Sequence, residues 1–261
     1  MLPATNYING LAASGQFTFT TGDAIDALRS SAVAVRAALR RLTAKGELAS
    51  PYKGFYTIVP PEYRRLGCLP ADQFLPQLME HLGQTYYVAL LSAAELHGAG
   101  HQRPQSLQVM VRSNRRPIVC GKVRVQFYAR KDLEQTATVE RNTPRGRIRV
   151  ASSEATALEL VGYADQCAGL DNVTSVLAEL VEVLDKPRLK VAAKNCPVAW
   201  VQRLGYLLDL AGHERIADSL VSVVASRARV VAPLVRSQPI THAPRSERWK
   251  LAINATVEPE E

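Results

Sequence analysis

Three arginines within one short stretch offer the clearest chemistry in this 261-residue sequence. The segment AVRAALRRLTAKGEL, Ala34 to Leu48, contains Arg36, Arg40 and Arg41, and no acidic residue precedes its glycine. A guanidinium group can form paired hydrogen bonds with phosphate oxygens or with the edge of guanine. The stretch therefore predicts either a nucleic-acid contact or an ordinary solvated helix face.

Helical spacing separates the apolar residues of this stretch from its basic residues. Apolar residues recur at i, i+3, i+4 and i+7, namely Val35, Ala38, Leu39 and Leu42. This spacing predicts a helix from Ser30, as its N-cap, to Lys45, with Gly46 ending it. The candidate nucleic-acid contacts are Ser30, Val33, Arg36, Arg40 and Arg41 on the outer face, with Tyr52 and Lys53 in the turn that follows.

The neighbouring elements would have to position this helix. We expect a helix over 4–14, then a short extended piece and a second helix capped by Thr20 and Asp23. After the arginine helix, the turn PYKG leads into a strand from Phe55 to Val59, which predicts a hairpin. This order is typical of a winged helix-turn-helix, whose recognition helix enters the major groove of DNA. We predict this domain over residues 1–62.

The remaining chain, 66–261, predicts a larger second domain, so that the fold class is mixed α+β with a small sheet and several helices. A basic α/β part is expected over 66–152 and a mostly helical part over 153–261. The expected helices are 72–83, 86–97, 153–168, 171–184, 197–211 and 213–225, and the expected strands are 106–112, 122–130, 146–152 and 248–254. The first three strands alternate apolar and polar residues, which predicts one covered sheet face and one wet, basic face.

Positive charge is unevenly distributed along the chain. The formal net charge is +8, and residues 103–149 alone hold twelve Lys or Arg against three Asp or Glu. Such asymmetry favours a polyanionic partner. A second basic surface is therefore predicted, comprising Arg112, Arg115, Arg116, Lys122, Arg124, Arg145, Arg147 and Arg149. Its alternatives are a nucleic-acid contact, an acidic-protein contact or a solvated sheet face.

Other chemistries have little support in the sequence. The four cysteines form no CxxC pair, so we expect free thiols in a reducing cytoplasm. No apolar run reaches the ~20 residues of a membrane helix, and we expect no signal peptide. His97 and His101 are four apart, but Gly98 and Gly100 predict that the helix has ended there. A helix terminus packed on the sheet is favoured over a metal site.

Enzyme motifs are also missing from the sequence. It contains no GxxxxGK[ST], GxGxxG or GxSxG, and Asp132 with Glu134 beside Lys131 is weak evidence for a nuclease. We therefore expect no catalytic residue, no metal and no cofactor.

Several stretches together resemble the AbiEi antitoxins of type IV toxin–antitoxin systems. The longest is GFYTIVPPEYRRLGCLPADQFLPQLMEHLGQTYYVALLSAAELHGAGHQRPQSLQVMV, within which YYVALLSAAELHGAGHQ is the most distinctive part. GLDNVTSVLAELVEVLD, QRLGYLLD and ERWKLAIN resemble the C-terminal domain of the same family.

The resemblance implies two roles in one chain. The N-terminal domain would bind inverted repeats in its own promoter, with Arg36, Arg40, Arg41 and Lys53 as matching positions, and repress the operon. The C-terminal domain would counteract a nucleotidyltransferase-like toxin, in systems that act in abortive phage infection. The alternatives are a transcription regulator with a ligand-sensing or assembly domain and no toxin, or a nucleic-acid-processing enzyme.

Overall fold

The structure is a computed structural model and describes residues 3–100 and 104–258. Internal contacts divide the chain into two compact units. We call residues 1–86, 105–131 and 140–149 the N-terminal unit, and residues 87–104, 132–139 and 150–261 the C-terminal unit. Each unit is assembled from separate segments of the chain, because the middle of the sequence passes between them more than once.

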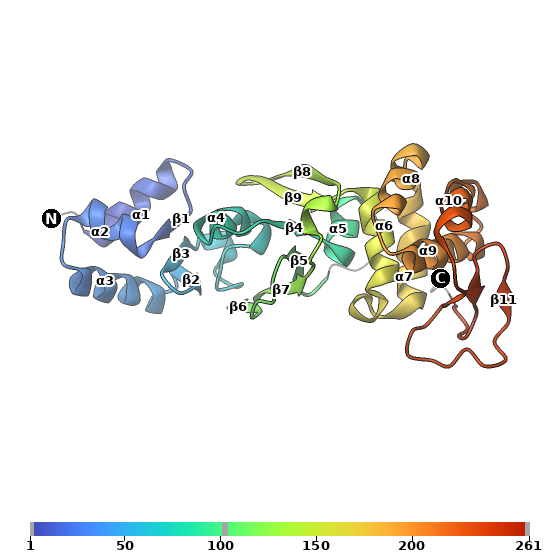
Figure 1. The fold of residues 1–261 in the computed structure, drawn as a ribbon. Helices are drawn as coiled ribbons and strands as arrows, with labels where there is room; N and C mark the ends of the chain where they lie inside the picture. Colours follow the sequence, from blue (N-terminus) through green and yellow to red (C-terminus); the bar gives the residue numbers. More distant parts are fainter. Residues whose placement is uncertain (1–2, 101–103, 259–261) are drawn as a thin grey trace. The chain divides into compact units, whose positions relative to one another are not determined.

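The N-terminal unit begins with a winged helix-turn-helix, as predicted. Its elements are α1 (Ala4–Ala13), β1 (Thr18–Thr20), α2 (Thr21–Leu28), α3 (Ala32–Ala44), β2 (Leu48–Tyr52) and β3 (Phe55–Ile58). Figure 1 shows the three helices next to a small sheet, whose strand order is β1-β3-β2. Phe19, Leu28 and Leu39 belong to one buried apolar cluster that joins the helices to the strands. The expected Thr20–Asp23 capping box is present.

The start of α3 differs by one residue from the prediction. Ser31, not Ser30, is the N-cap, and its Oγ accepts a hydrogen bond from the backbone N–H of Ala34 at 3.3 Å. Arg29 ends α2 in the left-handed conformation, with φ 45°. Ser30 therefore occupies the turn between the helices. The other end of α3 agrees with the prediction, since Gly46 follows it with φ +73°.

The rest of the N-terminal unit contains η1 (Pro61–Tyr63), η2 (Ala71–Gln73), α4 (Leu75–His81), β5 (Leu107–Val111), β6 (Ile118–Cys120) and β7 (Val123–Ala129). β5 and β7 pair in parallel, with Val109 opposite Phe127, and β6 pairs antiparallel to β7. The expected alternation holds in β7, whose Val123, Val125 and Phe127 are buried. It is wrong for β5, because Gln108 and Met110 are buried as well as Val109.

The predicted helix over 86–97 is also wrong in its first turn. Residues Tyr86–Val88 form strand β4, and helix α5 spans only Leu90–Leu96. Two tyrosines and a valine suit a strand better than a helix. Val88 pairs in parallel with Val150 of β9 (Gly146–Ala151), which follows β8 (Thr138–Thr143). The largest sheet has the strand order β6-β7-β5-β4-β9-β8.

The C-terminal unit is mostly helical, as predicted. Its longer helices are α6 (Ser153–Gly162), α7 (Gly169–Leu180), α8 (Lys186–Lys194), α9 (Val198–Leu210) and α10 (Glu214–Arg227), with shorter turns η3 (Leu133–Gln135), η4 (Ala164–Cys167) and η5 (Val181–Val183). The prediction missed α8, which Asp185 caps through a hydrogen bond from the Arg188 N–H. A small sheet of β10 (Ala232–Pro233), β11 (Arg245–Ser246) and β12 (Leu251–Ala252) follows. Among the described residues, no helix has the length and apolar character needed to cross a membrane.

Candidate nucleic-acid interface

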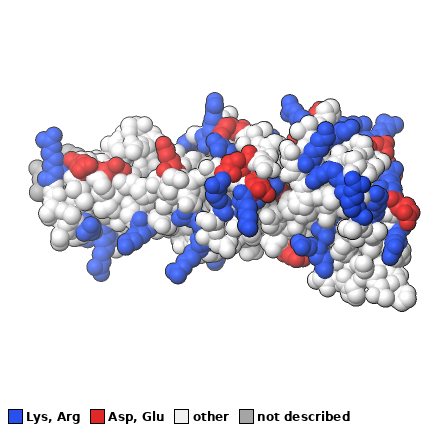
Figure 2. Space-filling view, viewed as in Figure 1, with Lys and Arg blue, Asp and Glu red and all other residues white. Residues whose placement is uncertain are grey.

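Helix α3 divides its residues as the sequence predicts. Val35, Leu39 and Leu42 are buried against the domain core, whereas Val33 is 76% exposed. The side chains of Arg36, Arg40 and Arg41 are exposed as well. Within residues 3–100 and 104–258, no acidic side chain forms an ion pair with these three arginines. On the face drawn in Figure 2, basic side chains lie over α3 and acidic ones over α2. α3 therefore presents uncompensated positive charge.

The turn between β2 and β3 forms the wing of the winged helix-turn-helix. It is contacted by the loop 112–117, which belongs to the predicted second basic surface. Tyr52 and Lys53 are exposed at the turn between β2 and β3. The guanidinium carbon of Arg115 lies 5.7 Å from the centre of the Tyr52 ring and 5.8 Å from that of Phe127. These distances are typical of cation–π contacts. The fold of the N-terminal unit therefore brings the 112–117 loop next to the wing, although about 60 residues separate the two in the sequence.

Most side chains of the predicted second basic surface are exposed, but not all of them are free to contact a partner. Arg112, Arg116, Lys122, Arg124, Arg147 and Arg149 are exposed, whereas Arg115 and Arg145 are half-buried. The Arg145 guanidinium lies 3.4 Å from the centre of the Phe17 ring, and its Nε donates to Gln73 Oε1 at 2.9 Å. It also lies 3.8 Å from a carboxylate oxygen of Glu62. These contacts hold Arg145 within its own unit.

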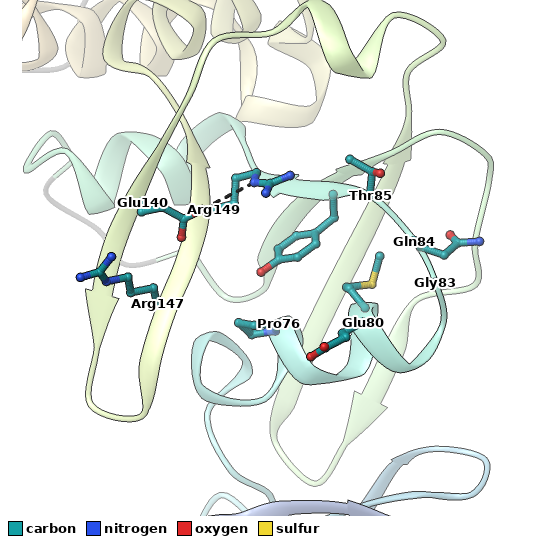
Figure 3. A pocket seen from close by; sticks show the side chains of 10 residues that line it. Pro76, Glu80, Gly83, Gln84, Thr85, Glu140, Arg147 and Arg149 are labelled. Carbon is teal, nitrogen blue, oxygen red and sulfur yellow. Dashed lines mark ion pairs between the residues drawn. The ribbon is translucent and has the colours of Figure 1, made fainter.

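Arg147 and Arg149 line a pocket of about 410 Å³ that also contains carboxylates. Figure 3 shows them on the β8–β9 hairpin together with Glu140, facing Pro76 and Glu80 of α4. Arg149 Nε lies 3.6 Å from Glu140 Oε1. Two carboxylates beside two arginines give this pocket no formal excess of charge. It is therefore less suited to a polyanion than the outer face of α3.

Tyr86 lies in the same pocket with a perturbed hydroxyl. Burial raises the pKa of Tyr86 to about 12, and the negative charge of Glu140 adds to this effect. A backbone hydrogen bond with Arg149 opposes this rise. A phenol is neutral at physiological pH with or without the shift, so the shift reports the burial of Tyr86 at the pocket wall.

Cys68 and Cys120 form a thiol pair that the sequence analysis did not anticipate. All four cysteines are free, but Cys68 and Cys120 share a hydrogen bond that raises the pKa of Cys68 and lowers that of Cys120. Close packing of the backbone brings them together, since a Cβ at Gly121 would collide with the carbonyl oxygen of Leu66. Only the paired glycines, Gly67 and Gly121, hinted at this approach in the sequence.

The candidate histidine pair is described only in part. His97 is at the C-terminal end of α5, and its Nε2 lies 2.7 Å from the carbonyl oxygen of Ala151. His101 lies outside the described residues. In the described part of the chain, no group of three or more His, Cys, Asp or Glu is arranged to hold a metal ion.

The fold as a whole is shared with a solved structure. The crystal structure of the RV2827C protein from Mycobacterium tuberculosis matches over 95% of this chain and 90% of its own, with 19% sequence identity and a TM-score of 0.68. This likeness confirms the mixed α+β fold with N-terminal helices and a larger C-terminal part. A comparison of the sequence with curated proteins found no match.

A family model matches a segment in the middle of the chain. The AbiEi antitoxin C-terminal domain matches residues 87–210, from β4 to the end of α9. This range includes all but the first residue of the distinctive stretch YYVALLSAAELHGAGHQ. Residues 87–210 thus match the AbiEi antitoxin C-terminal domain, and this match supports the resemblance to that family and an antitoxin role in a toxin–antitoxin system.

Proposed function

We propose that this chain is a type IV antitoxin that represses its own operon and neutralises a nucleotidyltransferase-like toxin. The observation that carries the repressor half is the outer face of α3, where Arg36, Arg40 and Arg41 are exposed and unpaired with acids among the described residues. The AbiEi domain over 87–210 supports the antitoxin half. We further propose the division of labour predicted from the sequence, with DNA binding in 1–62 and antitoxin activity in 66–261.

In this proposal α3 enters the major groove of promoter DNA. Small residues such as Ala37 and Ala44 lie between the arginines on this face, which lets the helix backbone approach the bases closely. The arginines bind guanine edges or phosphates, and the exposed Val33 offers an apolar contact for a thymine methyl group. Inverted repeats would be read by two copies of the protein, one on each half-site.

The wing and the neighbouring loop add contacts to the sugar–phosphate backbone. Lys53 is exposed at the wing turn and follows Tyr52 in the sequence, and Arg115 contacts the Tyr52 ring. Residues 105–131 contain no Asp or Glu, so no carboxylate from this segment opposes a phosphate. Of the partners that the sequence left open for the basic region, DNA is therefore the one we propose for the 112–116 loop.

A double substitution separates the two halves of the proposal. Arg40→Ala with Arg41→Ala removes two exposed cations from α3 without touching its buried face. We expect weaker operator binding in a gel-shift titration, with the salt dependence reduced by roughly one to two units. Rescue of growth when the variant is co-expressed with the toxin encoded beside it should be unchanged. Arg215→Ala with Arg229→Ala, two exposed arginines of the C-terminal unit, is the matched control for DNA binding.

The two halves can fail separately. Unchanged operator affinity and salt slope would refute α3 as the recognition helix. Absence of a nucleotidyltransferase-like neighbouring gene, or failure of the wild-type chain to rescue growth, would favour a transcription regulator without a toxin partner. Metal-dependent cleavage or nucleotide transfer by the purified chain would instead support an enzyme.

A further inference from the structure

A cavity of about 550 Å³ lies within the C-terminal unit, and none of the candidate nucleic-acid contacts lines it. It is bounded by η4 and the start of α7 on one side and by the 234–238 segment on another. Arg203 of α9 and Arg236 both line it. A cavity of this size can hold a small organic ligand.

Arg203 is the unusual residue of this cavity. It is only 4% exposed, and its Nε donates to the carbonyl oxygen of Pro233 at 3.0 Å. No residue in the described ranges accepts a hydrogen bond from its Nη1 or Nη2. A role in holding Pro233 explains the Nε bond but leaves Nη1 and Nη2 without a protein acceptor among the described residues. Neither nitrogen is one of the buried side-chain atoms without a partner, so both are accessible to a ligand in the cavity.

A second cation, Arg236, lines the same cavity and acts on Arg203. Burial lowers the pKa of Arg203, and the positive charge of Arg236 lowers it further. Neither arginine forms an ion pair with an acid among residues 3–100 and 104–258. An anion between the two arginines would remove this repulsion and supply acceptors for the unused donors.

The other lining groups indicate what the rest of the ligand must offer. The first turn of α7, Gly169 to Asp171, lines the cavity, and its N-cap residue Ala168 provides no side-chain hydrogen bond. Its free N–H groups favour an acceptor. Asp165 and Asp171 also line the cavity, and Asp171 Oδ1 accepts a hydrogen bond from the Glu258 N–H. These carboxylates can accept hydrogen bonds from hydroxyl groups but would repel a second anionic group.

We propose that this cavity binds a small sugar phosphate, with the phosphate held by Arg203 and Arg236 and the sugar hydroxyls by Asp165 and Asp171. A phosphate monoester accepts two parallel hydrogen bonds from an arginine fork. The aspartates disfavour di- and triphosphates, since these place further negative charge beside them. Asp165, Asp171 and Arg203 lie within the matched residues 87–210, whereas Arg236 lies beyond them. The whole site belongs to the C-terminal unit and does not depend on DNA binding by α3.

Binding can be tested on the full chain by titration calorimetry and thermal unfolding. The probes are ribose 5-phosphate, AMP, ATP, ribose and inorganic phosphate, at matched ionic strength. We expect ribose 5-phosphate or AMP to bind and raise the melting temperature, with ribose inactive and ATP weaker. Arg236→Gln should weaken binding about 10-fold, as expected for the loss of a charge-assisted hydrogen bond. Arg229→Gln, an exposed arginine that does not line the cavity, is the matched control.

Arg203→Gln should abolish binding, and if it fails to fold, Arg236→Gln still decides the question because that side chain is exposed. The proposal is overturned if no phosphate monoester binds the wild type, or if Arg236→Gln binds as tightly as the wild type. Equal binding of ATP and AMP would also overturn it, because the aspartates would then play no part. None of these results bears on operator binding or toxin rescue.

Discussion

The two units of this protein differ in where they keep their charges. The N-terminal unit holds 19 Lys or Arg against 7 Asp or Glu, a net charge of +12, whereas the C-terminal unit holds 13 against 17, a net charge of −4. The overall charge of +8 therefore conceals two units of opposite sign. Because non-specific attraction to DNA follows net charge, only the N-terminal unit is suited to a phosphate backbone.

The two units also differ in the charged side chains that they bury. The winged helix-turn-helix core around Leu39 is apolar. The C-terminal unit instead buries charged and polar side chains, among them Glu154, Glu159, Gln202 and Arg203. The winged helix-turn-helix thus keeps its charged side chains outside its apolar core, whereas the C-terminal unit buries several of its own. The following substitutions test this contrast.

Leu39→Asp should have the largest effect, because it places a carboxylate in the apolar core of the winged helix-turn-helix. Leu39 is fully buried, and no cation in its cluster could pair with the new charge. We expect a loss above about 4 kcal/mol, enough to unfold this domain, seen as lost helical circular dichroism. Val33→Asp, on the exposed face of α3, should leave stability within about 0.5 kcal/mol. Equal stability of the two variants would contradict the assigned helix faces.

Tyr87→Phe should cost less, but in the other unit. The Tyr87 hydroxyl donates to Glu159 Oε1 at 2.6 Å in a buried site, and it lies 3.2 Å from Thr136 Oγ1. Loss of a hydrogen bond to a buried carboxyl group should lower the free energy of unfolding by about 1–3 kcal/mol. Chemical denaturation can measure this change. Tyr206→Phe is the control, because no described residue is a partner of its hydroxyl, and it should hardly change the free energy of unfolding. Equal losses of stability in the two variants would show that the hydrogen bond of Tyr87 to Glu159 does not stabilise the unit.

The contrast also explains which parts of the fold the sequence could predict. Helical periodicity and caps located α1, α2, α3 and the hairpin, because each of these elements has one apolar face. The same reasoning failed at Tyr86–Val88, where a strand between two others is buried and leaves no periodic signal. It missed α8 because that nine-residue helix contains four Lys or Arg and buries only Leu189 and Ala193, which leaves a weak apolar stripe.

The candidate sites also differ in how far the sequence could predict them. Exposure of Arg36, Arg40 and Arg41 follows from spacing alone, because only local geometry is involved. The contact of Arg115 with Tyr52 and the fork of Arg203 depend on residues distant in the sequence. Arg145 illustrates the limit most clearly, since it belongs to the same basic run as Arg147 yet stacks on Phe17. Composition cannot distinguish a structural arginine from an exposed one.

Arg145→Ala and Arg147→Ala form a matched pair within one hairpin. Removing Arg145 loses the stacking on Phe17 and the hydrogen bond to Gln73, so stability should fall by about 1–2 kcal/mol. Arg147 is exposed and lies on the pocket wall, so its removal should change stability by less than about 0.5 kcal/mol. Thermal unfolding of both variants checks the difference. A larger loss for Arg147→Ala would reverse the roles assigned to the two side chains.

Arg115→Ala should have the smallest effect, a modest change in operator binding. It tests whether the proposed DNA-binding surface extends beyond the winged helix-turn-helix. If Arg115 contacts one phosphate beside the wing, its loss should lower the salt slope of operator binding by about 0.9 and weaken affinity a few-fold. The loss should be similar for unrelated DNA, since a phosphate carries no sequence information. Arg229→Ala, an exposed arginine of the negatively charged unit, should leave both quantities unchanged. An unaltered slope for Arg115→Ala would confine DNA binding to α3 and the wing, and the charge of the 112–116 loop would then serve another partner.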